Sequence, residues 1–285
     1  MADQNEGPPM KRQKAAETLI ARAGKEARPK LELCAADLVS VEKLTDKGAQ
    51  RESTKVPTLN QQQPAKNVPK DYVGFKDLET MVDGKIMEGY QLMDTPHERV
   101  GPAVLTRFAR GGKTRTLQEI GKMLQERQIP TLFITFNDLT AIDNDERQNI
   151  TALQSVLMRI AWGAATEATV QKVIENAKKA GTSPTARNWT VSNFDFSEWI
   201  QAACIRKDEV EAWLQDQPLI LLIDEFNQLL TKDLLDELKM ADENTLARES
   251  DQAEEVAAFI SKSFLKAELS FFGVFQPCRD GGRWA

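Results

Sequence analysis

Four consecutive residues of this 285-residue sequence have the chemistry needed to bind a phosphate group. They are Gly111, Gly112, Lys113 and Thr114. Because glycine has no Cβ, the backbone N–H groups of Gly111 and Gly112 could approach a phosphate closely, and a following helix would add the positive end of its dipole. Lys113 would reach the β and γ phosphates of a nucleotide, and the hydroxyl of Thr114 would bind Mg²⁺.

A second pair of candidate residues, Asp224 and Glu225, follows an apolar run. Asp224 would hold the Mg²⁺ directly or through water, because hard cations prefer carboxylate oxygens. Glu225 would polarise the attacking water, while positioning and charge stabilisation supply most of the rate in phosphoryl transfer. Arg110 and Arg115 flank the first motif and could stabilise charge on the nucleotide, but the sequence does not decide which of them faces it.

Three apolar runs predict the strands that must position these residues: 100–105, 130–136 and 218–224. The last two are apolar enough for strands that are buried on both faces. A helix is expected after the first motif, because apolar residues recur there at helical spacing, namely Leu117, Ile120, Met123 and Leu124. Strands that alternate with helices predict a three-layer α/β fold with a mainly parallel sheet. Both motifs would then lie at the carboxyl edge of that sheet, where such folds bind ligands.

Other patterns predict further helices. The apolar residues between Ile150 and Trp162 fit a helix with one buried stripe. Asp195 and Glu198 have the spacing of a capping box, which predicts the start of a helix that includes Ala203 and Cys204. The acidic residues 242–255 are interpreted as a solvated connection. Three tryptophans lie within apolar helical patterns and are expected in the core: Trp162, Trp199 and Trp213.

Each of the two motifs also has a purely structural explanation. The tetrapeptide Gly-Gly-Lys-Thr can occur in any turn, and a full Walker loop would have a glycine at the position of Arg107. Asp224 and Glu225 could cap a helix that follows a core strand. A strand before each motif, in the order seen here, favours binding of a nucleotide, either ATP or GTP.

Composition argues against several other classes of protein. A net charge of −6 is not typical of a protein that coats nucleic acid by charge alone. Three widely separated cysteines and the single His97 have no metal-ligand spacing, which argues for a reducing compartment and against structural zinc. The sequence has no visible secretory signal and no apolar run long enough to cross a bilayer. We therefore expect no membrane partner.

Residues 1–70 are expected to form a flexible, partly basic arm and linker ahead of a folded domain at residues 71–268. They are rich in Gln, Lys, Pro and Ala and poor in aromatic residues. An apolar island from Leu31 to Leu44 could form one short element that docks on something else. The basic cluster from Pro9 to Lys14 is either a solvated tail or a nuclear import signal. The expected location is the nucleus, or otherwise the cytoplasm.

The two motifs together resemble the P-loop domain shared by Crinkler-type effectors and retrotransposon hot spot proteins. The resemblance covers Tyr72 to Leu265 and is carried by residues 107–115, 132–137 and 221–229. It implies a P-loop NTPase domain that is usually coupled to a nuclease-like module and acts in a nucleus, with a nuclear protein or nucleic-acid-associated complex as partner. The resemblance also implies that the missing first glycine, here Arg107, is a regular feature of the loop in this family. The residues that match its phosphate, magnesium and acidic positions are Lys113, Thr114, Asp224 and Glu225.

Two departures from this family bear on function. Residues 1–70 do not resemble the ubiquitin-like header of secreted Crinklers, which favours the hot spot branch. Family members continue past residue 268 into a further strand and more domain, whereas residues 269–285 look like the tail of a truncated copy. Phe271 to Phe275 could still add a strand, but no sensor residue is obvious there. Nucleotide binding could therefore persist where hydrolysis does not.

Three functions remain open at this point. The first is an NTP-binding and hydrolysing domain that drives a conformational change. The second is a catalytically inactive interaction module that keeps the P-loop fold and binds a partner through the sheet edge or the basic arm. Loss of the terminal strand and of a sensor residue would favour it. The third is a nucleotide kinase, which would need an Arg-rich lid that is not visible in the sequence.

Overall fold

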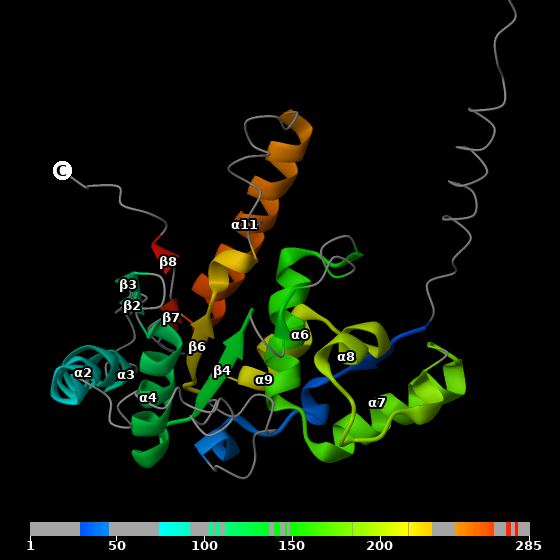
Figure 1. Cartoon of the computed structure of the whole chain (residues 1–285), viewed down its shortest axis with the longest axis horizontal. Coiled ribbons are helices and arrows are strands. Elements are labelled where there is room, and N and C mark those ends of the chain that lie inside the picture. Colours follow the sequence, from blue (N-terminus) through cyan, green and yellow to red (C-terminus); the bar gives the residue numbers. More distant parts are fainter. Residues whose placement is uncertain are drawn as a thin grey trace, which may run out of the picture.

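A four-stranded sheet, in which every pair of neighbouring strands is parallel, forms the centre of the structure (Figure 1). Its strand order is β2-β7-β6-β4, and the strands are Ala103–Val104, Phe272–Val274, Ile220–Asp224 and Thr131–Thr135. The chain is therefore a mixed α/β protein, the class predicted from the sequence. The computed structural model describes residues 29–45, 74–91, 103–104, 107–108, 112–136, 140–142, 146, 149–183, 185–215, 217–229, 243–264, 272–274 and 277–278.

The strands β4 and β6 lie side by side and are buried on both faces. Their register runs from Thr131 opposite Ile220 to Thr135 opposite Asp224. All of β6 and the first four residues of β4 are buried, as is typical of apolar strands in a parallel sheet. The strands expected at 130–136 and 218–224 are confirmed, and the one expected at 100–105 is confirmed over the two residues of β2.

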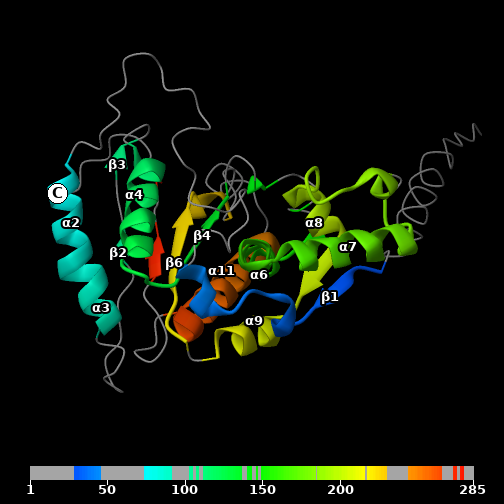
Figure 2. The same cartoon turned by 90° about the horizontal axis from the view of Figure 1, so that it is seen from below.

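Helices pack on both faces of this sheet, because alternate residues of β4 and β6 point to opposite sides. Phe133 and Leu222 belong to a cluster with the helices on one side, whereas Leu132 and Leu221 belong to a cluster with the helices on the other. Figures 1 and 2 show α4 and α6 on opposite sides of β4 and β6. The helices on the side of Phe133 and Leu222 are α2 (Phe75–Met81), the π-helix η3 (Val82–Met87), α3 (Glu88–Gln91) and α4 (Lys113–Glu126). The helices on the side of Leu132 and Leu221 include α6 (Ala152–Ala164) and α11 (Glu243–Phe264).

Helix α6 is buried almost all round, so the prediction of one buried stripe was wrong. The reason is that α6 packs against β4, α8, α9 and α11 together. It approaches β4 so closely that a Cβ on Gly163 would lie 2.7 Å from Leu132. The ring of Trp162 contacts that of Trp199 at 5.3 Å. The tryptophans expected in the core, Trp162, Trp199 and Trp213, are all buried.

The capping box at Asp195 is confirmed, but the helix that it starts is shorter than predicted. Helix α8 (Phe196–Ala202) ends before Ala203, which with Cys204 and Ile205 forms strand β5 (Ala203–Ile205). The reason is a long-range pairing, since β5 bonds in parallel to β1 (Leu31–Leu33). Helices α7 (Glu167–Ala180), η6 (Ala186–Asn188) and α9 (Lys207–Leu214) complete this part of the chain.

The acidic region 242–255 also differs from the prediction of a solvated connection. From Glu243 onward it is the first part of α11, whose amino-terminal end extends away from the sheet (Figure 1). The helix continues because its carboxyl-terminal half has an apolar face at helical spacing. Val256, Phe259 and Ile260 on that face are buried in the core cluster that includes α6. No described helix is long and apolar enough to cross a membrane.

Part of the segment expected to be a flexible arm is docked on the core. Beyond β1, the structure describes two short 3₁₀ helices, η1 (Ala35–Asp37) and η2 (Val41–Thr45). Leu33, Val41 and Leu44 are buried. The indole N–H of Trp213 donates to the carbonyl of Val39 at 2.7 Å. The apolar island of residues 31–44 is therefore part of the folded body.

We expect Asp37→Asn to lower the free energy of unfolding by about 0.5 to 1 kcal/mol at pH 7, the range for a partly exposed ion pair. Asp37 pairs with Lys172 at 2.6 Å and accepts a hydrogen bond from the backbone of Cys34. Burial alone would raise the pKa of Asp37, but the hydrogen bonds from Lys172 and Cys34 outweigh burial and lower it. Since the folded pKa lies below the unfolded one, this contribution is present above the unfolded pKa and is lost as pH falls through the folded pKa.

Urea unfolding at pH 7 and pH 3 tests this expectation. The difference between Asp37→Asn and the wild type should shrink as the solution becomes acidic below about pH 4. Asp208→Asn, which removes an exposed carboxylate paired with Arg206, is the control and should change stability little. A loss of stability at Asp37 that is equal at both pH values would contradict the ion-pair explanation.

Candidate functional site

The first motif lies at the start of α4, as the sequence predicted. Gly112 is the residue before the helix and has φ of 74°, a left-handed conformation that glycine adopts without strain. Its carbonyl accepts hydrogen bonds from the backbone and the hydroxyl of Thr116. Lys113 is the first helical residue and is only 7% exposed. The N–H groups of this first turn give the site a positive electrostatic end.

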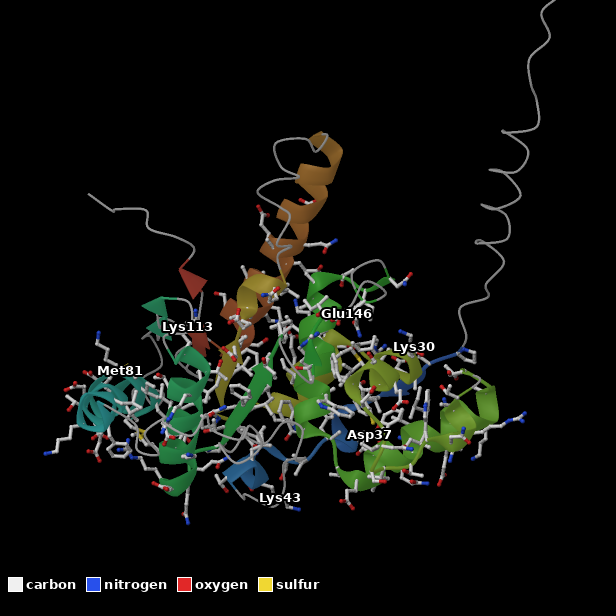
Figure 3. All side chains as sticks on the ribbon, viewed as in Figure 1. Lys30, Asp37, Lys43, Met81, Lys113 and Glu146 are labelled. Carbon is white, nitrogen blue, oxygen red and sulfur yellow. The ribbon has the colours of Figure 1, made fainter. Side chains whose placement is uncertain are left out.

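The second motif lies at the carboxyl end of β6. Asp224 is the last residue of that strand and is 2% exposed. Its neighbour in register on β4 is Thr135, the last residue of that strand. Both strands therefore end at the same edge of the sheet. Figure 3 shows Lys113 at the end of the molecule toward which β4 and β6 point.

A direct hydrogen bond joins the two motifs. The hydroxyl of Thr114 donates to Oδ2 of Asp224 at 2.9 Å, across 110 residues of sequence. The bond uses the hydroxyl proton and leaves the oxygen of Thr114 with lone pairs that can bind a cation. Thr114 and Asp224 thus place a hydroxyl and a carboxylate, both hard oxygen donors, side by side.

This oxygen pair fits Mg²⁺. Magnesium is usually held by one or two protein groups together with water and substrate phosphates, rather than by a cage of side chains. Within the described residues, no group of three or more His, Cys, Asp or Glu could hold a metal ion. The hydroxyl of Thr114 and the carboxylate of Asp224 are the oxygen donors that would hold Mg²⁺ here. A bound Mg²⁺ would supply charge neutralisation to the phosphate oxygens.

Glu225 has a backbone conformation that is unusual for its residue type. Its φ is 55° and its ψ is 37°, which for a residue other than glycine costs on the order of 1 kcal/mol or more. Glu225 precedes the 3₁₀ helix η7 (Phe226–Gln228), and its carbonyl accepts a hydrogen bond from Gln228. The chain therefore turns sharply just after Asp224, and the half-buried Glu225 lies at the turn.

The structure describes some of the expected phosphate-binding residues and not others. Arg110 and Gly111 lie outside the described residues, as does His97. Arg115 is the third residue of α4 and is half-buried, and its part in phosphate binding stays a prediction. Two residues of the expected turn, Arg107 and Phe108, form the short strand β3 (Arg107–Phe108), which pairs with β8 (Pro277–Cys278).

Part of the carboxyl-terminal tail of residues 269–285 joins the central sheet. Strand β7 lies between β2 and β6, and Gly273 is opposite both Ala103 and Leu222. Of the two possibilities left open by the sequence, the strand within Phe271 to Phe275 is therefore the one found, and the terminal strand is not lost. The short Phe-Phe-Gly-Val sequence is apolar and can fill an interior position of a parallel sheet.

Sequence reasoning missed a buried polar cluster at the same edge, centred on Arg159 of α6. Arg159 is 1% exposed and pairs with Glu146, which is 3% exposed, at 2.6 Å. Its Nε donates to the carbonyl of Thr135, at the end of β4. The signal was present in the sequence, since Arg159 lies inside an apolar helical run and a buried arginine requires a partner.

We expect Gly112→Ala to destabilise the chain by about 1 to 2 kcal/mol, because a left-handed backbone places Cβ close to a carbonyl oxygen. A Cβ at this position would meet nothing within 4 Å, so crowding by other groups does not contribute. Gly84→Ala is the matched control, since its Cβ also meets nothing and its φ is not positive. Thermal unfolding of both variants is the measurement. Equal effects at the two positions would refute a conformational role for Gly112.

Known proteins do not supply an identity for this arrangement. No family model, no curated protein and no solved structure gives a significant match to the chain. Its function is therefore inferred from its own residues and contacts.

Proposed function

We propose that this chain binds a nucleoside triphosphate, ATP or GTP, together with Mg²⁺ and hydrolyses it. The hydrogen bond between Thr114 and Asp224 is the observation that carries the proposal. It unites a glycine-containing helix start with an acidic strand end, the two parts that a nucleotide site of this kind needs. Both parts are at the carboxyl edge of a parallel sheet, where α/β proteins bind ligands.

The fold that we propose for this function is the P-loop NTPase type, with three layers. It is supported by the parallel four-stranded sheet and by helices on its two faces. The motif before α4 follows β2, and the acidic pair follows β6. The likeness to retrotransposon hot spot and Crinkler-type proteins remains part of this proposal and rests on residues 107–115 and 221–229.

Each residue of the site has a role in this proposal. Lys113 neutralises the β and γ phosphates, since a buried ammonium group is costly unless an anion compensates it. The N–H groups at the start of α4 bind phosphate oxygens. Thr114 and Asp224 bind the cation, and Glu225 orients the attacking water.

The alternative of a catalytically inactive interaction module was favoured by loss of the terminal strand and of a sensor residue. Because β7 fills the position between β2 and β6, the lack of an obvious sensor residue is what still favours this alternative. A nuclear location and a nuclear partner also stay proposals. The basic cluster of residues 9–14 on which they depend lies outside the described residues.

We expect Lys113→Ala to weaken binding of Mg-ATP by about 10- to 100-fold, because hydrogen bonds to charged groups contribute about 1.5 to 3 kcal/mol. Lys122→Ala is the matched control on the same helix, where Lys122 pairs with Glu119 and is 36% exposed. Titration with a fluorescent ATP analogue measures both affinities. A folded wild-type chain that shows no saturable binding, or equal affinities for the two variants, would refute the proposed site.

Glu225→Gln should leave the dissociation constant for Mg-ATP within about twofold and lower kcat by about 100-fold or more, the range for loss of a general base. The amide keeps the size of the side chain but cannot accept a proton from water. Release of inorganic phosphate at saturating nucleotide is the measurement. A kcat that remains at the wild-type level would exclude Glu225 as the residue that orients water.

A further inference from the structure

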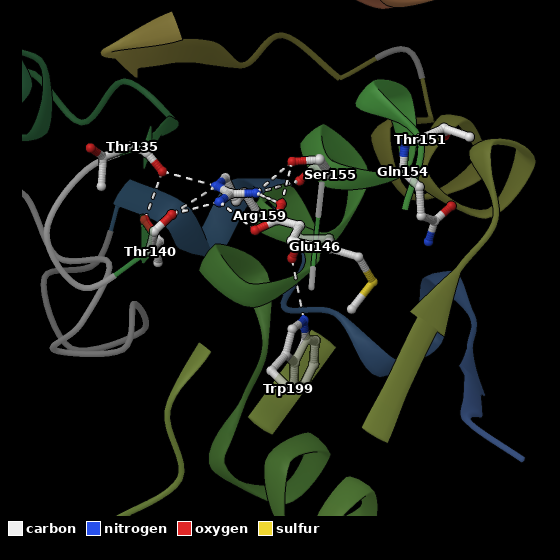
Figure 4. A network of polar contacts seen from close by, with 9 residues as sticks. Thr135, Thr140, Glu146, Thr151, Gln154, Ser155, Arg159 and Trp199 are labelled. Atoms are coloured by element: carbon white, nitrogen blue, oxygen red, sulfur yellow. Dashed lines mark hydrogen bonds and ion pairs between the residues drawn. The ribbon is translucent and has the colours of Figure 1, made fainter. Parts of the chain in front are cut away.

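A buried ion pair lies close to the proposed site but is not part of it. The guanidinium of Arg159 binds Glu146 with two nitrogens, at 2.6 Å and 3.2 Å. It also donates to the carbonyls of Thr135 and Thr140, at 3.0 Å and 2.6 Å. Ser155 donates to Glu146 at 2.5 Å. Figure 4 shows the guanidinium at the centre of these contacts, which come from α6, from the end of β4 and from the residues that follow it.

The guanidinium also lies against two aromatic rings. Its central carbon is 4.4 Å from the ring centre of Phe136 and 4.6 Å from that of Phe196. Arg159 therefore fixes the end of β4 twice, through the carbonyl of Thr135 and through the ring of the next residue. A buried ion pair contributes little net stability compared with apolar packing. What it supplies here is one defined geometry for the residues at this edge.

Phe136 connects Arg159 to the acidic motif, because it contacts both. Its backbone N–H donates to the carbonyl of Asp224 at 3.1 Å. Its ring contacts the ring of Phe226 edge to face, with centres 6.0 Å apart. Glu225 lies between these two contacts in sequence and has the left-handed backbone described above. Phe136 therefore holds the residues on both sides of Glu225.

We propose that Arg159 is a positioning residue that holds Glu225 in the orientation needed for hydrolysis. This inference rests on the proposed function. In that reaction the water oxygen forms a bond to the γ phosphorus, and the bond from that phosphorus to the β–γ bridging oxygen breaks. The electron pair of the broken bond stays on that oxygen, which leaves as part of the nucleoside diphosphate. One proton of the water passes through Glu225 to the inorganic phosphate. The reaction requires Glu225 to be correctly placed, whereas binding depends on Lys113, Thr114 and Asp224.

The test separates catalysis from binding in the full chain. Arg159→Lys keeps the charge opposite Glu146 but cannot reproduce the planar fork that binds Thr135, Thr140 and Glu146 together. We expect kcat for Mg-ATP to fall by about tenfold or more, while the dissociation constant changes by less than about threefold. Phe136→Leu removes the ring between Arg159 and Phe226, and we expect it to shift kcat in the same direction.

The controls distinguish positioning from general loss of stability. Trp213→Phe removes a buried hydrogen bond to the carbonyl of Val39, which is separate from the hydrogen bonds of Arg159, and should leave both kcat and the dissociation constant near the wild type. If Arg159→Lys does not fold, Phe136→Leu decides the question. If kcat and affinity change by the same factor, or neither changes, the positioning role is overturned while nucleotide binding stands.

Two further outcomes are also decisive. If the wild type binds Mg-ATP but does not hydrolyse it at saturation, the positioning role is overturned and the binding proposal survives. If the folded wild type binds no nucleotide, the proposed function fails and this inference fails with it.

Discussion

The parallel pairing of β4 with β6 is the constraint on which the other parts of the structure depend. Both strands are apolar and buried on two faces, so helices must cover each face. Because the strands are parallel, the chain between them has to cross from one end of the sheet to the other, and α6 lies in that crossing. The same pairing brings Thr135 and Asp224 to one edge, where polar groups gather.

The polar groups at this edge fall into two sets with different surroundings. Thr114 and Glu225 are half-buried and can meet a ligand from solvent, whereas Arg159 and Glu146 are sealed in the interior. In a low-dielectric interior, a fully satisfied polar network is rigid. The buried pair of Arg159 and Glu146 is therefore suited to fixing the backbone. Phe136 contacts Arg159 and also Phe226, the residue that follows Glu225.

Local patterns predicted much of the fold and the order of its motifs. Features that depend on neighbouring residues were predicted correctly from the sequence. They are the strands β4 and β6, the helix after Gly112 and the capping box at Asp195. Features that depend on residues far apart in the sequence were not predicted. The strand at Ala203 needs Leu31 as its partner, the burial of α6 needs α11, and the partner of Arg159 is Glu146, thirteen residues earlier in the chain. The nearness of Thr114 to Asp224 was predictable only because each motif follows a predicted strand.

The position of β7 has a consequence for how the chain is made. In the described sheet, β2 bonds to β7 and not to β6, yet β7 is the last of these strands to leave the ribosome. Because the chain is synthesised from its amino-terminal end, β4 and β6 are both present while β2 still lacks its neighbour. A nascent chain that has reached Asp224 carries both motifs without the strand that bridges them. The sheet at whose edge Thr114 meets Asp224 is thus completed only when residues 272–274 have been translated.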